Sequence, residues 1–230
     1  MIGRHDFNSE WCGQEVGIVR DNAFFELSVL ERENRLRPWA WVEARQGAGL
    51  ASRALGAAGF TQVDTQMPFK IGLARLQGSP SLERAEVRFA DQEPFHVPGA
   101  ELADFAHERF AVLPGVGMAD LNRRYALWSE QLLQADPAHC MQVLVGGEVQ
   151  GWFLGRQTEQ GLELTLAMLK RGASISGHLL YHRALLAYAE RGARVGHAAF
   201  SVSNTPVLNI YASLGARFLA PVASWFWIAG

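Results

Sequence analysis

Residues 170–177, KRGASISG, place two cations and five small residues directly before a helical pattern. A turn of small residues that leads into a helix presents free main-chain N–H groups at the positive end of the helix dipole. Such groups bind phosphate or diphosphate. The sequence therefore predicts an anion site at this turn. The alternative is an ordinary helix start that is capped by Ser174 or Ser176.

The turn does not have the spacing of two common nucleotide-binding loops. The sequence contains neither GxxxxGK[ST] nor GxGxxG, which excludes a P-loop and a Rossmann fingerprint. The strands expected before the turn also form a meander and not a βαβ unit. An anion held here therefore contacts a turn of another class.

Composition indicates a folded protein without a nucleic-acid-binding surface. Of the 230 residues, 49% are hydrophobic and 19% are charged, and the formal net charge is −2, so no nucleic-acid partner is expected. Cys12 and Cys140 have no neighbour at metal-binding spacing, and we predict no metal. The N-terminus lacks the apolar core of a signal peptide, and no apolar run reaches the roughly 18 residues of a membrane span. We therefore expect a cytoplasmic protein.

The elements around the turn are predicted from hydrophobic periodicity. The clearest part is an antiparallel meander of three strands, 141–145, 148–156 and 162–169, whose first tight turn is Gly146-Gly147. The helix that begins in the turn ends at Arg191-Gly192. The other expected elements are strands at 85–91, 195–202 and 217–229 and helices near 100–108, 119–134 and 204–214.

The N-terminal third has a pattern of its own. Short strands are expected at 16–20 and 24–30, a helix over 39–60 that is broken at Gly47 and Gly49, and a strand over 61–76. Residues 77–81, QGSPS, form a turn-rich joint. We therefore expect a small truncated α/β domain over 1–77, followed by an α/β domain over 82–230. The second has a mixed, largely antiparallel sheet flanked by helices.

The motifs after residue 160 resemble the Gcn5-related N-acetyltransferase (GNAT) superfamily. That family has Arg/Gln-x-x-Gly-x-Gly/Ala after its fourth strand, then an Asn, and then a Tyr followed by a Leu-Gly-Phe-like close. The positions that carry the pattern here are Arg171, Ser174, Ser176, Asn204, Tyr211 and Leu214-Gly215. The resemblance covers about residues 82–230. It implies the GNAT fold with acetyl-CoA as co-substrate.

Serine stands at both glycine positions of the family's loop. Ser174 and Ser176 keep a main-chain N–H and add a hydroxyl donor, but serine does not share glycine's ease at positive φ. If the loop requires positive φ at these positions, serine holds it under strain and coenzyme A binds weakly.

The N-terminal region resembles a narrower group, dTDP-fucosamine acetyltransferase and its relatives. FNSEWCG at 7–13 is similar to their Trp-Asp-Ser-Glu-Phe-Phe-Gly opening, and GAAGF at 56–60 is similar to a later turn. ERFAVLPG at 108–115 and DLNRRYALWSEQLL at 120–133 resemble their Arg-Phe…Asp-x-x-Tyr-x-x-Trp segment. The resemblance implies that the acceptor is a nucleotide-linked amino sugar.

The GNAT resemblance also implies roles for individual residues. In that family's fold, strand 162–169 would splay from strand 195–202. Pantetheine pairs with the main chain of the former strand, and the N–H groups of the loop hold the diphosphate. The implied cofactor-binding residues are Met168, Leu169, Arg171, Gly172, Ala173, Ser174, Ile175, Ser176, Gly177 and Asn204. For Asn204, a helix cap is the equal alternative.

Catalytic and acceptor-binding residues follow from the same resemblance. Tyr211 is expected to protonate the departing thiolate, or else to be a buried tyrosine bonded to the main chain. Glu163 could act as the base through water, or could be a solvated edge carboxylate. Arg109, Tyr125 and Trp128 are candidates for binding the substrate, with helix packing as their alternative.

We therefore predict an acyl-CoA-dependent N-acetyltransferase that acts on a primary amine of a small molecule. One alternative is a degenerate GNAT that binds acyl-CoA or a protein partner without turnover. The other is a tandem-GNAT transferase that uses aminoacyl-tRNA. A homodimer is expected if the final segment exposes an unpaired strand.

Overall fold

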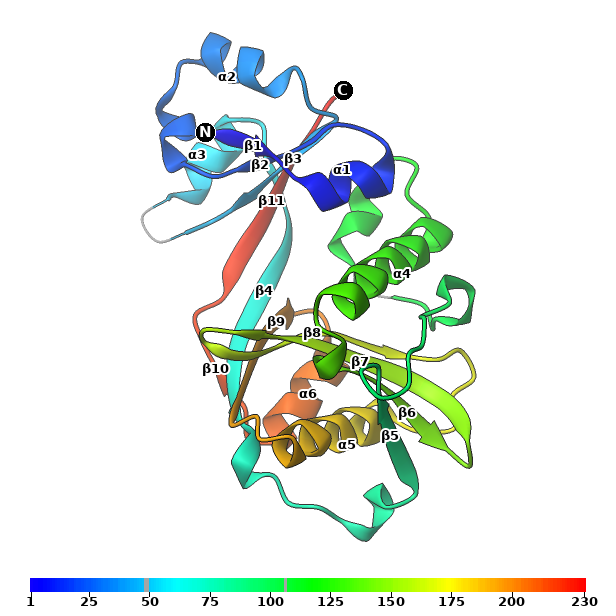
Figure 1. Cartoon of the computed structure of the whole chain (residues 1–230). Helices are drawn as coiled ribbons and strands as arrows, with labels where there is room; N and C mark the ends of the chain where they lie inside the picture. Colours follow the sequence, from blue (N-terminus) through cyan, green and yellow to red (C-terminus); the bar gives the residue numbers. More distant parts are fainter. Residues whose placement is uncertain (48–49, 106) are drawn as a thin grey trace. The chain divides into compact units, whose positions relative to one another are not determined.

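The computed structural model describes residues 1–47, 50–105 and 107–230. Within these residues, eleven strands form a mixed sheet, and six α-helices and several 3-10 turns complete the α/β fold. The chain divides into two compact units, and each is described by itself (Figure 1). The first unit comprises Met1–Gln66, Arg109–Val116 and Ala220–Gly230, and the second comprises Met67–Glu108 and Gly117–Leu219.

The sheet of the first unit contains the last strand of the chain. Its order is β1-β2-β3-β11-β4. The strands are β1 (Ile2–Arg4), β2 (Val16–Val19), β3 (Trp41–Arg45), β11 (Val222–Ile228) and the first part of β4 (Thr61–Gly72). β11 is antiparallel to both β3 and β4. A separate N-terminal domain is therefore not evident, which corrects that part of the expected fold class. The domain boundary near residues 78–81 remains a prediction.

In the first unit, the strand predicted over 24–30 is wrong, and the helix predicted over 39–60 is present only over Ser52–Ala57. The helical segments are α1 (Asp6–Cys12), η1 (Asn22–Glu26), α2 (Val29–Leu36), α3 (Ser52–Ala57) and η5 (Arg109–Val112). Residues 24–30 are not a strand, because Ser28 and Glu31 form a capping box that starts α2. Residues 41–45 are not helical, because β3 is paired with β2 and β11 on its two sides. Gly49 lies outside the described residues.

The second unit contains the predicted meander. Its strand order is β4-β9-β8-β7-β6-β5, and β10 pairs with β4. The strands are β5 (Ala85–Phe89), β6 (Cys140–Val145), β7 (Glu148–Thr158), β8 (Gly161–Leu169), β9 (Val195–Ser201) and β10 (Arg217–Phe218). Gly146 and Gly147 have φ of 60° and 85°, as a two-residue turn between antiparallel strands requires. The meander and this turn are confirmed.

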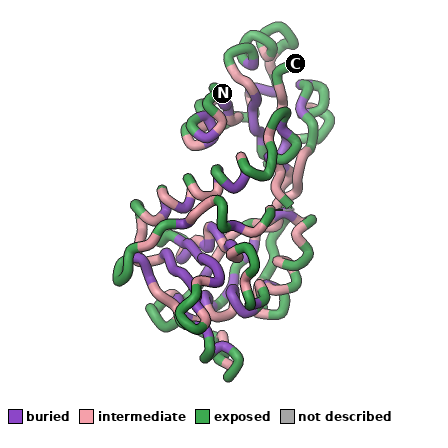
Figure 2. Tube along the Cα trace, turned by 90° about the vertical axis from the view of Figure 1, so that its right-hand side faces the viewer, coloured by how far each residue is buried: buried purple, intermediate pink, exposed green. Residues whose placement is uncertain are grey.

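Helices cover both faces of the second unit's sheet. They are α4 (Met118–Ala135), α5 (Gly177–Glu190) and α6 (Thr205–Ser213), with the short turns η2 (Leu73–Arg75), η3 (Pro80–Leu82), η4 (Gly99–Glu101) and η6 (Pro137–His139). α4 lies on one face of the sheet, and α5 and α6 lie on the other (Figure 1). Buried residues gather between these layers (Figure 2).

The helix predicted near residues 100–108 is wrong. Its described residues form the short turn η4 and irregular backbone; Ala106 lies outside the described residues. The physical reason is competition for main-chain partners. The Glu101 carbonyl accepts the Arg171 N–H, and the Ala103 N–H donates to the Leu169 carbonyl, so these groups do not bond within a helix.

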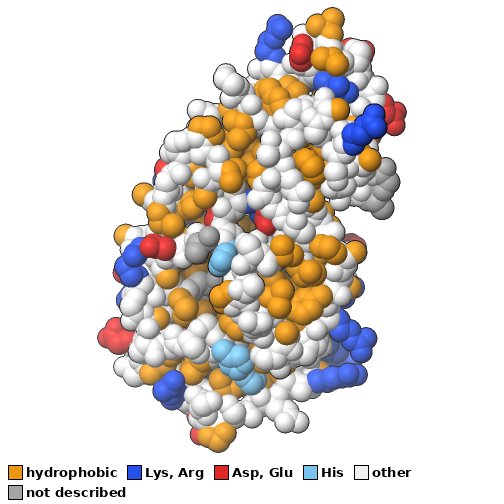
Figure 3. Space-filling view, turned by 180° about the vertical axis from the view of Figure 1, so that it is seen from behind, with side chains coloured by type: hydrophobic (Ala, Val, Ile, Leu, Met, Phe, Trp, Pro, Cys, Tyr) orange, Lys and Arg blue, Asp and Glu red, His pale blue; other side chains and the backbone are white. Residues whose placement is uncertain are grey.

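The remaining sequence predictions concern the surface. No helix in the described part of the chain is long and apolar enough to cross a membrane. The final segment forms β11, which has a strand on each side, so the reason given for a homodimer does not hold and the dimer remains only a prediction. Hydrophobic side chains lie on the surface of the second unit (Figure 3), and Phe218 and Leu219 are among its exposed large residues.

Candidate functional site

Strands β8 and β9 separate soon after they begin. They are parallel, and they pair only at Leu162 with Gly196 and at Glu163 with His197. β8 continues for six residues after Glu163, to Leu169. The predicted splay is therefore present, and it leaves the later part of β8 without a strand on that side.

A β-bulge lies where the strands separate. Leu154 and Arg156 of β7 oppose Leu166 and Glu163 of β8, so two residues of β8, Leu164 and Thr165, face one residue of β7. An extra residue shifts the alternation of side chains between the two faces. Leu162 and Leu164 accordingly pack in the core that includes α5, whereas Leu166 and Met168 pack in the core on the α4 side.

Beyond the bulge, the main-chain groups of β8 alternate between a bonded and an open side. Lys170 donates its N–H to the Gln150 carbonyl of β7 at 2.8 Å. Since such pairs alternate along an antiparallel ladder, Met168 also directs its main-chain groups at β7, and Ala167 and Leu169 direct theirs away. Within the described residues, the main-chain groups of Ala167 have no partner.

Of the two residues predicted to pair with pantetheine, Met168 is engaged with β7, and Leu169 is engaged through its carbonyl. Met168 faces Trp152 in the β7 ladder. The Leu169 carbonyl accepts the N–H of Ala103 at 3.1 Å. Within the described residues, the groups that stay open are the Leu169 N–H and the main-chain groups of Ala167, one residue before the predicted pair. No residue type in the sequence signals the bulge that precedes them.

In the turn after β8, one residue has the positive φ that favours glycine. Gly172 has a φ of 74°, and no non-glycine residue in the described part of the chain has positive φ. Ser176 is the helix cap, with a φ of −78° and a side chain that accepts the Leu179 N–H. The two serines are therefore not strained, and the capping alternative for Ser176 is present.

Only some of the predicted N–H groups remain available in the turn. Arg171, Ala173 and Ser174 donate theirs to Glu101, Lys170 and Gln150, respectively. Within residues 171–177, the N–H groups without an acceptor are those of Gly172, Ile175, Ser176 and Gly177. Main-chain N–H groups at and just before the start of a 14-residue helix are suited to an anion, and the anion site remains a prediction.

Gln150 holds this turn, and sequence reasoning did not single it out. Its side chain is 7% exposed. Its Oε1 accepts both the N–H and the hydroxyl of Ser174, at 2.7 and 3.0 Å. Its Nε2 donates to the Glu148 carbonyl at 3.2 Å. A glutamine in the middle of an apolar strand is the only signal that could have drawn attention to it.

Both cations of the turn are paired within the protein. Lys170 Nζ lies 3.2 Å from Glu101 Oε2, and Arg171 Nη2 lies 2.7 Å from Asp104 Oδ1. These pairs are partly exposed, so each contributes little to stability. The predicted anion site therefore has two protein carboxylates beside its cations.

Tyr211 lies in an aromatic core. It is 3% exposed, and its ring centroid is 4.0 Å from that of Phe69 and 5.2 Å from that of Tyr181. The Tyr188 hydroxyl donates to the His139 carbonyl at 2.6 Å, whereas no described residue bonds to the Tyr211 hydroxyl. Burial raises the pKa of Tyr211 well above its usual value. The phenol therefore stays protonated, as a proton donor must.

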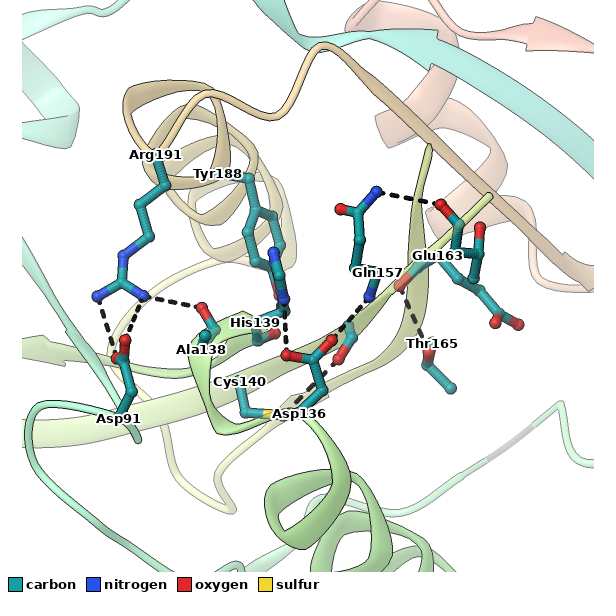
Figure 4. Close-up of polar contacts among 12 residues, drawn as sticks. Asp91, Asp136, Ala138, His139, Cys140, Gln157, Glu163, Thr165, Tyr188 and Arg191 are labelled. Carbon is teal, nitrogen blue, oxygen red and sulfur yellow. Dashed lines mark hydrogen bonds and ion pairs between the residues drawn. The ribbon is translucent and has the colours of Figure 1, made fainter. Parts of the chain in front are cut away.

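Asn204 and Glu163 have structural partners. Asn204 Oδ1 accepts the Val207 N–H at 3.2 Å and caps α6. The Glu163 carboxylate pairs with Arg156 Nε at 2.5 Å, and its carbonyl accepts the Thr165 hydroxyl (Figure 4). Their predicted cofactor and base roles remain predictions.

The three candidate substrate-binding residues belong to different units. In the second unit, Tyr125 stacks on Phe105 with centroids 3.8 Å apart. Trp128 packs on the α4 side of that unit's sheet. In the first unit, Arg109 Nη2 lies 3.7 Å from Glu43 Oε1, and Glu43 is fully buried. Arg109 therefore compensates a buried charge, which explains its position without a substrate.

The described residues give no candidate metal centre. No group of three or more His, Cys, Asp or Glu side chains lies close enough to hold an ion in this part of the chain. Burial raises the pKa of the Cys140 thiol to about 12, so that thiol is neither a ready ligand nor a nucleophile.

The second unit combines three features: a meander, a bulged strand that separates from its parallel neighbour, and a small-residue turn that starts a helix. The chain has the GNAT fold. No protein-family model and no curated protein matches the sequence, so the likeness is one of structure.

Three solved structures illustrate the likeness. A GCN5-related N-acetyltransferase from Sphaerobacter thermophilus has a TM-score of 0.60 and 16% identity, over 99% of this chain and 75% of that one. One from Kribbella flavida has a TM-score of 0.58 and 14% identity, over 94% and 82%. A tandem GNAT protein from the clavulanic acid biosynthesis pathway has a TM-score of 0.52 and 14% identity, over 95% and 76%.

Proposed function

We propose that this chain is an acyl-CoA-dependent N-acetyltransferase that moves an acetyl group directly from acetyl-CoA to a primary amine of a small molecule. The observation that carries the proposal is the open main-chain edge at Ala167, which leads into a turn with four N–H groups lacking acceptors. An extended amide chain that ends in a diphosphate matches both features.

The donor is held by main-chain groups in this proposal. The pantetheine amides bond to Ala167, and the diphosphate accepts the N–H groups of Gly172, Ile175, Ser176 and Gly177. Gln150 keeps the turn in place through Ser174. Direct main-chain pairing orients the thioester, and orientation is a large part of catalysis in a direct transfer.

The reaction needs no covalent enzyme intermediate. The neutral amine attacks the thioester carbonyl carbon, the carbon–sulfur bond breaks, and the thiolate takes the proton of the Tyr211 hydroxyl. The amine nitrogen loses one proton to water, with Glu163 as the proposed base behind that water. Tyr211 is reprotonated from solvent.

The acceptor class is the finer part of the proposal. The resemblance of residues 7–13 to the dTDP-fucosamine acetyltransferase group favours a nucleotide-linked amino sugar. Ser9 of that segment donates to the Val16 carbonyl and accepts the Val16 N–H, at 3.5 and 3.0 Å. This side chain therefore serves to pack α1, and the amino-sugar assignment depends on the resemblance alone.

The test combines calorimetric titration with acetyl-CoA and a turnover assay with a panel of primary amines that includes nucleotide-linked amino sugars. We expect saturable binding and release of free thiol with at least one amine. Absence of binding would contradict the proposal and favour an aminoacyl donor.

A second candidate function is an acyl-CoA-binding module without turnover. The ion pair of Glu163 with Arg156 favours it, because the pair accounts for that carboxylate without a role as a base. Binding of acetyl-CoA without thiol release for any amine would support this candidate.

A further inference from the structure

Residues 99–104, here called the strap, run along the open side of β8 at its end. The N–H of Ala103 donates to the Leu169 carbonyl at 3.1 Å, and the N–H of Arg171 donates to the Glu101 carbonyl at 2.6 Å. Leu102 between them is fully buried and forms a bridge with Lys170. The strap is therefore anchored, and it extends the sheet by one short segment beside the turn.

The strap also supplies the two carboxylates that engage the cations of the turn. Glu101 pairs with Lys170 and Asp104 pairs with Arg171, at 3.2 and 2.7 Å. The side chains of Arg171 and Asp104 are 56% and 55% exposed, so their pair breaks at little cost. Carboxylate and phosphate bind guanidinium in the same manner.

We propose that Glu101 and Asp104 set the affinity for the donor by competing with its phosphates for Lys170 and Arg171. The inference rests on the proposed function, since it assumes a diphosphate at the turn. The two carboxylates lower the affinity in two ways: they occupy the cations, and they repel a phosphate that approaches the N–H groups of the turn. The N–H groups then carry most of the phosphate binding in the native protein.

The test is calorimetric titration of the Glu101→Gln/Asp104→Asn variant with acetyl-CoA. Amides keep the size of the side chains, and the main-chain bonds and Leu102 are unchanged, so the strap should stay in place. We expect the dissociation constant to fall by roughly three- to tenfold, as expected for removing two exposed ion pairs and their repulsion. A thermal melt checks that the variant is folded.

The matched control removes two carboxylates from another exposed ion-pair cluster of the same unit. Glu86 and Glu93 both pair with Arg88, at 2.7 and 3.1 Å, and Glu86→Gln/Glu93→Gln makes the same change in net charge. We expect this control to bind acetyl-CoA like the wild type. A second probe, S-acetylpantetheine, lacks the phosphates, and the strap variant should bind it no more tightly than the wild type does.

A double-mutant cycle keeps the test informative if the double variant folds poorly. In the wild type, where Asp104 occupies the guanidinium, Arg171→Gln should weaken binding by clearly less than it does in the Asp104→Asn background. In the Asp104→Asn background the same change should weaken binding by roughly threefold or more.

Each outcome decides for or against the inference. Suppose that the wild type binds acetyl-CoA, and that Glu101→Gln/Asp104→Asn and Asp104→Asn bind it equally well or more weakly. The proposed function then stands, and the competition is overturned. Tighter binding of S-acetylpantetheine would also overturn it, because the effect would then not involve phosphate. If no variant binds acetyl-CoA, the proposed function fails and the inference fails with it.

Discussion

Strands β11 and β8 differ in how their main chains are used. In the first unit, β11 has β3 on one side and β4 on the other. In the second, β8 has β7 along one side but β9 for only two residues along the other. When a strand is bonded on both sides, its main-chain groups serve only to hold the fold. A strand with one open side leaves main-chain groups that an extended ligand can pair with.

The largest expected effect concerns the closed strand. Phe226 of β11 is 1% exposed and lies 5.0 Å from Trp41, centroid to centroid. Phe226→Ala should lower the free energy of unfolding by about 3–5 kcal/mol, because it leaves a cavity among aromatic rings. Urea denaturation measures this. A loss below about 1 kcal/mol would mean that β11 is not held as described.

Two proline substitutions compare the closed and open sides of β8 directly. Met168→Pro removes a ladder N–H and should cost about 3 kcal/mol or more. Ala167→Pro removes an N–H without a partner in the described residues and should cost clearly less. Thermal melts of the two variants give the comparison. Equal destabilisation by both would show that the Ala167 N–H is bonded in the folded protein.

Much of this contrast could be predicted from the sequence, and the reasons are local. The meander, the Gly146-Gly147 turn and the helix after the turn all depend on periodicity and turn residues within a few positions. The splay of residues 162–169 from 195–202 came from the family resemblance and is present.

Apart from residues 24–30, where the local capping box of Ser28 and Glu31 starts α2, the errors involve partners far away in the sequence. Residues 41–45 are a strand because residues 224–228 pair with them. Residues 100–105 are not a helix because the main chain at 169–171 bonds to them. The bulge at Leu164 and Thr165 changes which main-chain groups of β8 face its open side, and no residue type at that point signals a bulge. Single-sequence patterns do not contain such long-range pairings.

Tyr211→Phe tests the chemistry at the open side. We expect kcat to fall by about a hundredfold, which is typical of losing a general acid, while the affinity for acetyl-CoA stays the same. Because burial raises the pKa of Tyr211, the wild-type kcat should not decline on the basic side through loss of this proton below about pH 10. Steady-state kinetics over pH measures both. A variant with unchanged kcat would remove Tyr211 from the mechanism.

The smallest expected effect concerns the residue that holds the turn. Gln150→Leu leaves the Ser174 N–H without its acceptor, and the dissociation constant for acetyl-CoA should rise by roughly five- to tenfold, in keeping with the loss of one hydrogen bond. Gln142→Leu is a matched control, since Gln142 is also 7% exposed and lies on β6. Similar losses of affinity in both variants would show that the effect is not specific to the turn.

The most direct test of the central claim is a calorimetric titration of the wild type and of Ala167→Pro with acetyl-CoA. The account predicts saturable one-to-one binding by the wild type and a loss of at least tenfold in affinity in the folded proline variant, since it lacks a main-chain donor at the open edge. No binding by the wild type, or equal binding by both proteins, would contradict the claim that the open side of β8 holds the donor.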